Sequence, residues 1–322
     1  MSLQTPVVFL IFNRPDLTQQ VFQVIRQVQP KRLFVVADGP RDDAEAAVCQ
    51  ATRAIVEAQI DWDAQVERDY AEVNLGCRRR VASGLNWVFA QTDRAIILED
   101  DCWPEVSFFR FCEALLARYQ DDERVMAING TNYQQGRSVT PYSYYFSKYF
   151  HCWGWATWAR AWRYYDVEMK QWPAFRDGGY LRWVSEDEYE YRYWWRTFER
   201  MYRGEIDTWD YPFLLACFCQ NGLAATPRVN LVSNLGFGVK ATHTHNPHHR
   251  LARMPTQALP EITHPPFLTR HRDADRWVFD WVFGGRELRN RDTWPGRWRA
   301  FKTHLRRWLT WKETQSHASR RD

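Results

Sequence analysis

Three adjacent carboxylates, Glu99, Asp100 and Asp101, follow directly on the apolar segment 95–98. Carboxylates delivered from a dry core to its rim repel one another, so their ionised forms need compensation. A divalent cation supplies it, and hard oxygen ligands select Mg²⁺ or Mn²⁺ with coordination positions left for phosphate oxygens. The alternative is a solvated acidic turn before a helix. The strand-end position favours the metal site.

Polar residues also follow two other apolar segments. Asn13 and Arg14 come after the segment 7–12, and Asp38 comes after 33–37. In open α/β sheets ligands bind outside the carboxyl ends of the strands. A guanidinium suits a diphosphate, whereas an ion pair with Asp16 is the alternative for Arg14. Asp38 can accept hydrogen bonds from a nucleobase or a ribose.

The elements that must position these residues follow from hydrophobic periodicity. Short β-branched runs alternate with amphipathic segments through the first 130 residues, which predicts βα units and a parallel sheet. Strands are expected at 7–12, 33–37, 65–70, 95–98 and 125–128, and helices at 17–28, 43–59, 78–90 and 106–119. Pro15-Asp16 and Pro104-Glu105 are expected to open the first and last of these helices.

The second half of the chain has a different texture. Residues 132–209 are dense in Tyr and Trp, and a Gly/Asn-containing stretch and a His/Pro loop follow. We expect a mixed half built onto the edge of the first sheet. The predicted division is 1–131 for nucleotide-sugar binding, 132–250 for the acceptor side of the same domain, and 251–322 for an extension. The extension's basic aromatic helix, from about 292 onward, either contacts an anionic membrane surface or packs with a snorkelling basic face.

The order of short motifs resembles a known family. VVFLIFNRP, LFVVADGP, NLGCRRRVASGLNWVF, RAIILEDD, VMAINGTN and FHCWGWATW occur in the order seen in GT-A glycosyltransferases. The resemblance is closest to the N-acetylglucosaminyltransferases that initiate complex N-glycan branching, and related bacterial glycosyltransferase-like proteins share the layout. It covers roughly residues 6–245. It implies a Rossmann-like mixed sheet flanked by helices, with a Trp-rich acceptor-side half.

The same resemblance assigns roles to individual residues. Asp101 would contact the metal, Asp100 would lie near the ribose and Glu99 near the donor sugar. It also places Arg14 at the diphosphate and Asp38 at the base. A further expectation concerns the start of the helix at 78–90, where the resemblance turns Arg78 and Arg79 toward the phosphates; a solvated helix face is the alternative.

A catalytic base is needed on the acceptor side. A carboxylate near the acceptor hydroxyl removes its proton while cationic groups stabilise the departing diphosphate. The family places this acid in a Trp-Asp context, which selects Asp210 over Asp207; a helix-capping Asp is the alternative. The sequence TWDYPF has Tyr211 where the family has a second acid. The acidic run 186–188 is a rival that is typical of a solvated helix face.

Two further groups complete the expected donor site. Trp153 and Trp155 bracket a glycine, and an indole there can form the floor under a sugar, although core packing is equally expected. Trp155 is the residue we assign to the donor. The resemblance also implies a phosphate-facing histidine, His243 or His245. A dedicated zinc site in this His cluster is disfavoured because neither Cys nor HExxH accompanies it.

Composition excludes several other classes. The chain has 322 residues, 45% of them hydrophobic, and a formal charge of +4 with acids interleaved among the bases, so no nucleic-acid groove is apparent. The seven Cys lack CxxC spacing and are expected to be reduced thiols. Neither a basic leader nor a run of ~20 apolar residues occurs, so the expected location is cytoplasmic, with peripheral contact at the inner membrane face through the basic helix.

The predicted function is transfer of a sugar from a nucleoside diphosphate sugar, UDP-linked by the resemblance, to a glycan, lipid-linked or other hydroxyl acceptor. Mn²⁺ or Mg²⁺ is the expected cofactor, and direct displacement with inversion is the expected course, with retention left open. A sugar-1-phosphate nucleotidyltransferase is the first alternative, but FNRPD lacks the Gly-rich loop that wraps a triphosphate. A non-catalytic carbohydrate-binding protein is the second.

Overall fold

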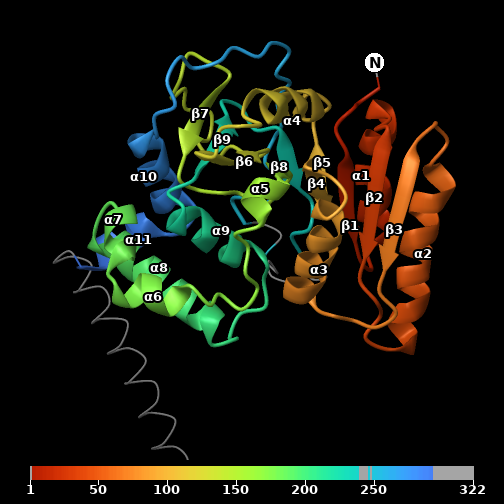
Figure 1. The fold of residues 1–322 in the computed structure, drawn as a ribbon, viewed down its shortest axis with the longest axis horizontal. Helices are drawn as coiled ribbons and strands as arrows, with labels where there is room; N and C mark the ends of the chain where they lie inside the picture. Colours follow the sequence, from red (N-terminus) through yellow and green to blue (C-terminus); the bar gives the residue numbers. More distant parts are fainter. Residues whose placement is uncertain (1, 239–245, 247–248, 293–322) are drawn as a thin grey trace, which may run out of the picture.

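The computed structural model describes residues 2–238, 246 and 249–292. Within them, one mixed sheet has eight strands in the order β3-β2-β1-β4-β8-β6-β9-β7. The strands are β1 (Val7–Ile11), β2 (Arg32–Ala37), β3 (Gln65–Tyr70), β4 (Arg94–Glu99), β6 (Val125–Asn129), β7 (Tyr144–Ser147), β8 (Trp155–Trp158) and β9 (Leu223–Pro227). Helices flank the sheet (Figure 1). The predicted fold class, a mixed α/β sheet flanked by helices, is confirmed.

The first half of the sheet is parallel. β1 pairs with β2 and with β4, and β2 pairs with β3, all in parallel register. Four helices alternate with these strands: α1 (Pro15–Val28), α2 (Asp43–Gln59), α3 (Cys77–Phe89) and α4 (Ser107–Arg118). Every residue of β1 is buried, as expected for a strand covered on both faces. The predicted strands and helices of this half are confirmed to within two residues.

The helix expected at 106–119 starts within one residue of its predicted position, but the residues expected to open it are wrong. Pro104-Glu105 does not open α4, which begins at Ser107. Pro104 instead ends the short strand β5 (Cys102–Pro104), which pairs antiparallel with β10 (Val232–Asn234). Glu105 still serves the helix, because its Oε2 accepts a hydrogen bond from the Ser107 amide at 2.7 Å. This long-range antiparallel pairing matters for the site, since it brings the segment after β10 beside the acidic triplet.

The second half continues the sheet beyond β4. β8 pairs antiparallel with both β4 and β6, and β9 pairs with β6 and β7. Figure 1 shows the N-terminal βα units on one side of the molecule and the helices of the second half on the other. Those helices are α5 (Ala159–Trp162), α6 (Trp172–Asp177), α7 (Tyr180–Val184), α8 (Glu188–Tyr202), α9 (Asp210–Cys219), α10 (Arg272–Trp281) and α11 (Gly285–Asp292).

The described part of the extension packs on this second half. The Arg270 guanidinium contacts the fully buried Asp275 at 2.5 Å, and Asp275 also accepts a hydrogen bond from Ser147 of β7. Arg289 of α11 pairs with Asp187 at 2.6 Å. The basic aromatic segment 293–322 lies outside the described residues, and the predicted domain boundaries stay predictions. No described helix combines the length and the apolar character needed to cross a membrane.

Candidate active site

Two cavities meet at the acidic triplet. The first, which we call the sheet-side cavity, has a volume of about 590 Å³ and lies at the carboxyl ends of β1, β2 and β4. It is lined by Leu10, Ile11, Phe12, Asn13, Arg14, Val36, Asp38, Arg41, Asn74, Gly76, Cys77, Arg80, Val81, Glu99, Asp100 and Asp207. This is the position at which parallel α/β sheets bind ligands.

The second cavity, which we call the aromatic cavity, has a volume of about 360 Å³ and opens on the Trp-rich half. It is lined by Arg14, Cys77, Glu99, Asp101, Tyr133, Phe150, His151, Cys152, Trp153, Ile206, Thr208, Trp209, Asp210, Tyr211, Leu214, Asn234, Gly236, Leu251, Val282 and Phe283. Arg14, Cys77 and Glu99 border both cavities. A ligand with two chemically different ends can therefore extend across the triplet.

Each member of the triplet has a different partner. Oε1 of Glu99 accepts a hydrogen bond from the Trp209 indole at 3.2 Å, and Oδ2 of Asp100 accepts one from the Phe12 amide at 3.2 Å. Oδ2 of Asp101 accepts one from Arg14 at 2.7 Å. Burial raises the pKa of both Glu99 and Asp100, and the charge of Asp101 raises the Glu99 and Asp100 pKa values further. The surroundings thus disfavour the ionised forms of Glu99 and Asp100.

Arg14 compensates part of the negative charge of the triplet. Its Nη1 lies 2.7 Å from Oδ2 of Asp101 and 3.7 Å from Oδ1 of Asp100. The residue lies just before α1, which begins at Pro15, so the fixed chain turn directs the guanidinium to the end of β4. The guanidinium thus pairs with the triplet, whereas a pair with Asp16 was the alternative. A guanidinium at this position can leave a carboxylate and bind a phosphate oxygen instead.

The donor set limits which metal can fit. The described residues contain no group of three or more His, Cys, Asp or Glu arranged to hold a metal. Asp101 offers hard oxygens, with Oδ1 3.5 Å from the Asn234 side-chain amide and Oδ2 on Arg14. Mg²⁺ and Mn²⁺ are commonly held by one or two carboxylates plus substrate phosphates. The described residues therefore fit a cation shared with a phosphate ligand.

The loop after β10 is shaped around Asp101. The Leu235 amide donates to the Asp101 carbonyl at 2.8 Å, and Oδ1 of Asn234 accepts from the Gly236 amide at 2.8 Å. A Cβ on Gly236 would collide with the Asp101 carboxylate. Glycine is thus required here for close approach of the backbone.

Asp38 lines the sheet-side cavity, but both of its carboxylate oxygens accept hydrogen bonds from the protein. Oδ1 accepts from the amides of Gly39 and Leu75, and Oδ2 accepts from the Asn74 side chain and the Gly76 amide, at 2.8 to 3.2 Å. Burial raises its pKa, although these donors oppose the shift. Asp38 therefore fixes the 74–76 loop that forms this wall of the cavity.

Arg78 is a correction. The guanidinium donates to the carbonyls of Met201, at 3.2 Å, and Val167, and it borders neither cavity. These contacts fasten the start of α3 to the second half, so the side chain is turned away from the expected phosphates. Arg79 is exposed and lies 3.8 Å from Glu168. Sequence spacing places both at a helix start but gives no information on these long-range partners.

Trp155 is also a correction. It is fully buried and stacks on Trp209 with ring centroids 5.4 Å apart. It begins β8, which lies between β4 and β6, so both of its faces are covered. Trp153, two residues earlier and before the strand, lines the aromatic cavity. Of the two Trp residues in this motif, Trp153 is therefore the one whose indole reaches the cavity.

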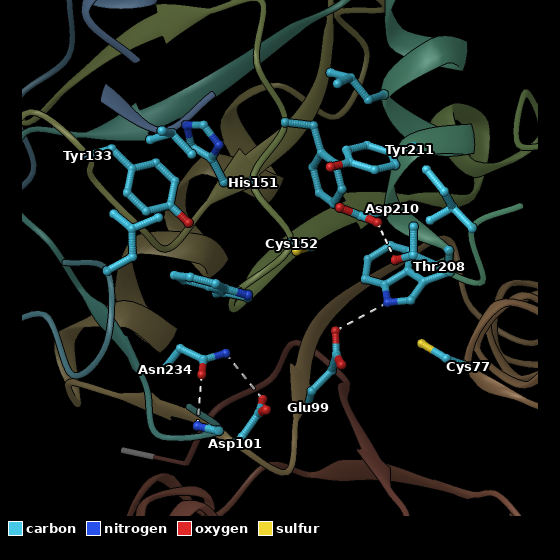
Figure 2. A pocket seen from close by; sticks show the side chains of 18 of the residues that line it. Cys77, Glu99, Asp101, Tyr133, His151, Cys152, Thr208, Asp210, Tyr211 and Asn234 are labelled. Atoms are coloured by element: carbon cyan, nitrogen blue, oxygen red, sulfur yellow. Dashed lines mark hydrogen bonds between the residues drawn. The ribbon is translucent and has the colours of Figure 1, made fainter. Parts of the chain in front are cut away.

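Asp210 lies in the aromatic cavity at the start of α9 (Figure 2). Its Oδ1 accepts a hydrogen bond from the Thr208 hydroxyl at 2.5 Å. In Figure 2, Glu99 lies between Asp101 on one side and the Thr208–Asp210 pair on the other. The rival acids are engaged elsewhere: Glu186 pairs with Arg272, Asp187 caps α8, and Glu188 pairs with Arg182.

Several cavity residues were not anticipated. His151, Tyr133 and Asn234 all line the aromatic cavity (Figure 2). Burial lowers the His151 pKa to about 3, so its ring is neutral, and its Nε2 has no hydrogen-bond partner within the described part of the chain. In the sequence, only the position of His151 beside the Trp153 motif indicated that it could belong to the site. His243 and His245 lie outside the described residues.

No family model and no curated protein matches the sequence. Among solved structures the chain is similar to S. aureus TarS 1–349, with 12% identity, a TM-score of 0.39, and coverage of 69% of this chain and 58% of that chain. It therefore spans less than two thirds of the TarS chain. It is also similar to UDP-glucose pyrophosphorylase complexed with UDP-glucose, with 7% identity, a TM-score of 0.30, and coverage of 50% of this chain and 78% of that chain. Both similarities are distant.

Proposed function

We propose that the protein is a GT-A glycosyltransferase that moves a sugar from a nucleoside diphosphate sugar, with UDP the expected nucleotide, to a hydroxyl of a glycan or lipid-linked acceptor. One observation carries the proposal: a cavity at the strand ends and an aromatic cavity join at Glu99, with Arg14 at the junction. A donor has a polar nucleotide, a diphosphate and a sugar in the same linear order.

The sheet-side cavity is the proposed nucleotide site. The loop 74–76, which Asp38 holds, would face the base, and Asp100 would lie toward the ribose. Arg14 would bind the diphosphate, because a guanidinium binds phosphate oxygens bidentately. Asp101 would hold Mn²⁺ or Mg²⁺ together with those oxygens, and the cation would stabilise the charge of the leaving diphosphate.

The aromatic cavity is the proposed site of the donor sugar and of the acceptor hydroxyl. Trp153 offers an indole face, and Glu99 lies at the sugar end of the triplet. In a direct displacement, Asp210 takes the proton of the acceptor hydroxyl while the oxygen of that hydroxyl bonds to the anomeric carbon of the donor sugar. The bond from that carbon to the phosphate oxygen breaks, and the nucleoside diphosphate leaves with the electron pair. The Thr208 hydroxyl holds the Asp210 carboxylate in place.

Thermal unfolding in the presence of nucleotide and metal tests this proposal. UDP with Mn²⁺ should raise the unfolding midpoint, EDTA should remove the rise, and Asp101→Asn should abolish it. Asp210→Asn should keep the rise but lose transfer by about a hundredfold or more. No stabilisation by any nucleotide sugar with metal would contradict the proposal. Glycan affinity indifferent to EDTA would favour a carbohydrate-binding protein instead, and the anomeric configuration of the product by NMR decides between inversion and retention.

A further inference from the structure

The segment 206–211 borders both cavities. Asp207 lines the sheet-side cavity, whereas Thr208, Trp209 and Asp210 line the aromatic cavity. Two of its hydrogen bonds reach other parts of the site: the Trp209 indole donates to Glu99, and Asp207 accepts from the start of α3. A short segment held at both of these points has little freedom to shift the carboxylate of Asp210.

The contact of Asp207 with α3 completes a helix end. Gly76 is the N-cap of α3 and offers no side-chain acceptor to the first turn. Oδ1 of Asp207 accepts a hydrogen bond from the Arg78 amide at 3.2 Å and so satisfies one of the donors that a helix start leaves without an intrahelical partner. A carboxylate is favourable at this positive end of the helix.

Two features show that the local structure accommodates this contact. Gly76 has a φ of 78°, which favours glycine, and a Cβ there would lie only 3.2 Å from Oδ2 of Asp207. The start of α3 is also a fixed point, because the Arg78 side chain donates to carbonyls of Val167 and Met201. Asp207 therefore attaches its segment to a rigid part of the molecule.

We propose that Asp207 is a positioning residue, which ties the segment 206–211 to the start of α3 and thereby sets Asp210 relative to Glu99 and the sheet-side cavity. This inference rests on the proposed function, in which Asp210 is the base. The tie needs an oxygen acceptor and does not need a charge. Asparagine can supply that acceptor and alanine cannot.

The test compares Asp207→Ala, Asp207→Asn and a control variant, Glu205→Ala. Glu205 immediately precedes the segment, is 47% exposed in its side chain, pairs with Arg200 at 3.2 Å and borders neither cavity. Two quantities are measured in each full-length protein. The first is kcat and the donor KM, obtained by varying the donor at a fixed saturating acceptor concentration, and the second is hydrogen exchange of the Arg78 amide and of the segment 206–211.

Asp207→Ala should lower kcat about tenfold or more with a small change in donor KM, since a small misplacement of a reacting group is costly. It should also speed exchange at Arg78. Asp207→Asn should restore both values, and Glu205→Ala should change neither. Wild-type kcat in Asp207→Ala, or equal loss in Asp207→Asn, would overturn the inference. If the wild-type protein transfers no sugar, the proposed function fails, and unchanged exchange in Asp207→Ala would refute the tie independently.

Discussion

The indole nitrogen of Trp209 donates a hydrogen bond to Oε1 of Glu99 at 3.2 Å, joining the start of α9 to the end of β4. This contact opposes the rise in the Glu99 pKa that burial causes. Trp209→Phe keeps an aromatic ring over Trp155 but removes the donor. We expect a loss of about 0.5 to 1.5 kcal/mol in the free energy of unfolding, measured with urea, because one hydrogen bond to a partly buried acceptor is removed.

Trp158→Phe is the matched control for this change. Its indole is also buried and donates to the Leu116 carbonyl at 3.1 Å, away from both cavities. Both variants should lose stability, but only Trp209→Phe should also weaken stabilisation by UDP with Mn²⁺. Equal nucleotide responses in the two variants would mean that the Trp209 contact has no part in the site.

The charge of Glu99 should make the metal-free protein sensitive to pH. Its folded pKa is raised, so its neutral form stabilises the fold fully below the unfolded value of ~4.3, and this contribution is lost as pH rises through the raised value. Glu99→Gln keeps an acceptor for Trp209 and removes the charge. Between about pH 5 and about pH 8, with EDTA present, the wild-type unfolding midpoint should fall more steeply than that of Glu99→Gln.

Glu45→Gln serves as the opposite case. The ion pair with Arg41 lowers the Glu45 pKa to about 2, so its stabilising contribution is lost only in acid. In the same pH interval this variant should follow the slope of the wild-type protein. Parallel slopes for Glu99→Gln and wild type would show that the Glu99 carboxyl does not titrate in this interval.

Much of the first half was predictable because its physics is local. Strands buried on both faces read as continuous apolar runs, so β1, β2 and β4 could be located, and with them Arg14, Asp38 and Glu99 at the strand ends. The strand-end rule then indicated that these side chains lie together. Their meeting in one sheet-side cavity needed no long-range information beyond strand adjacency.

The second half was less predictable because its contacts join residues far apart in sequence. Trp153 and Trp155 are equivalent as a motif, and only the insertion of β8 between β4 and β6 buries Trp155 and leaves Trp153 on the cavity. Arg78 similarly sits at a predictable helix start, but its carbonyl partners are about 90 and 120 residues away, at Val167 and Met201. Hydrophobic periodicity gives no information on such long-range pairings.

Gly236→Ala should disturb Asp101 without touching the core. A Cβ at this position would collide with the Asp101 carboxylate, so the loop or the carboxylate must move. We expect the affinity for UDP with Mn²⁺, measured by calorimetry, to fall about tenfold, because a displaced ligand loses its alignment with the phosphate. Gly136→Ala is the control: its φ of 79° makes alanine strained, but its Cβ would meet nothing within 4 Å. That variant should lose about 1 kcal/mol of stability and keep its nucleotide affinity.

In Arg14→Gln, Mn²⁺ should take over the charge compensation that the guanidinium provides in the wild-type protein. The guanidinium lies 2.7 Å from Asp101 and 3.7 Å from Asp100, so its removal leaves two carboxylates without their partner. In EDTA the variant should lose about 3 kcal/mol of stability, as when one member of a buried pair is removed. Mn²⁺ alone should then raise the unfolding midpoint more than in the wild-type protein, because the metal meets carboxylates that no guanidinium neutralises. Affinity for UDP should still fall, since the guanidinium proposed to bind the diphosphate is lost.

Arg32→Gln separates this effect from the general loss of an ion pair. Arg32 pairs with Glu67 at 2.8 Å, and the two side chains are 24% and 19% exposed, close to the 18% of Arg14 and 14% of Asp101. It borders neither cavity, so its variant should lose some stability and gain no response to Mn²⁺. If Mn²⁺ raises the midpoints of wild type, Arg14→Gln and Arg32→Gln equally, the cation is not bound by the carboxylates that Arg14 neutralises. Asp101 would then lose its proposed role as metal ligand while Arg14 kept its own at the diphosphate.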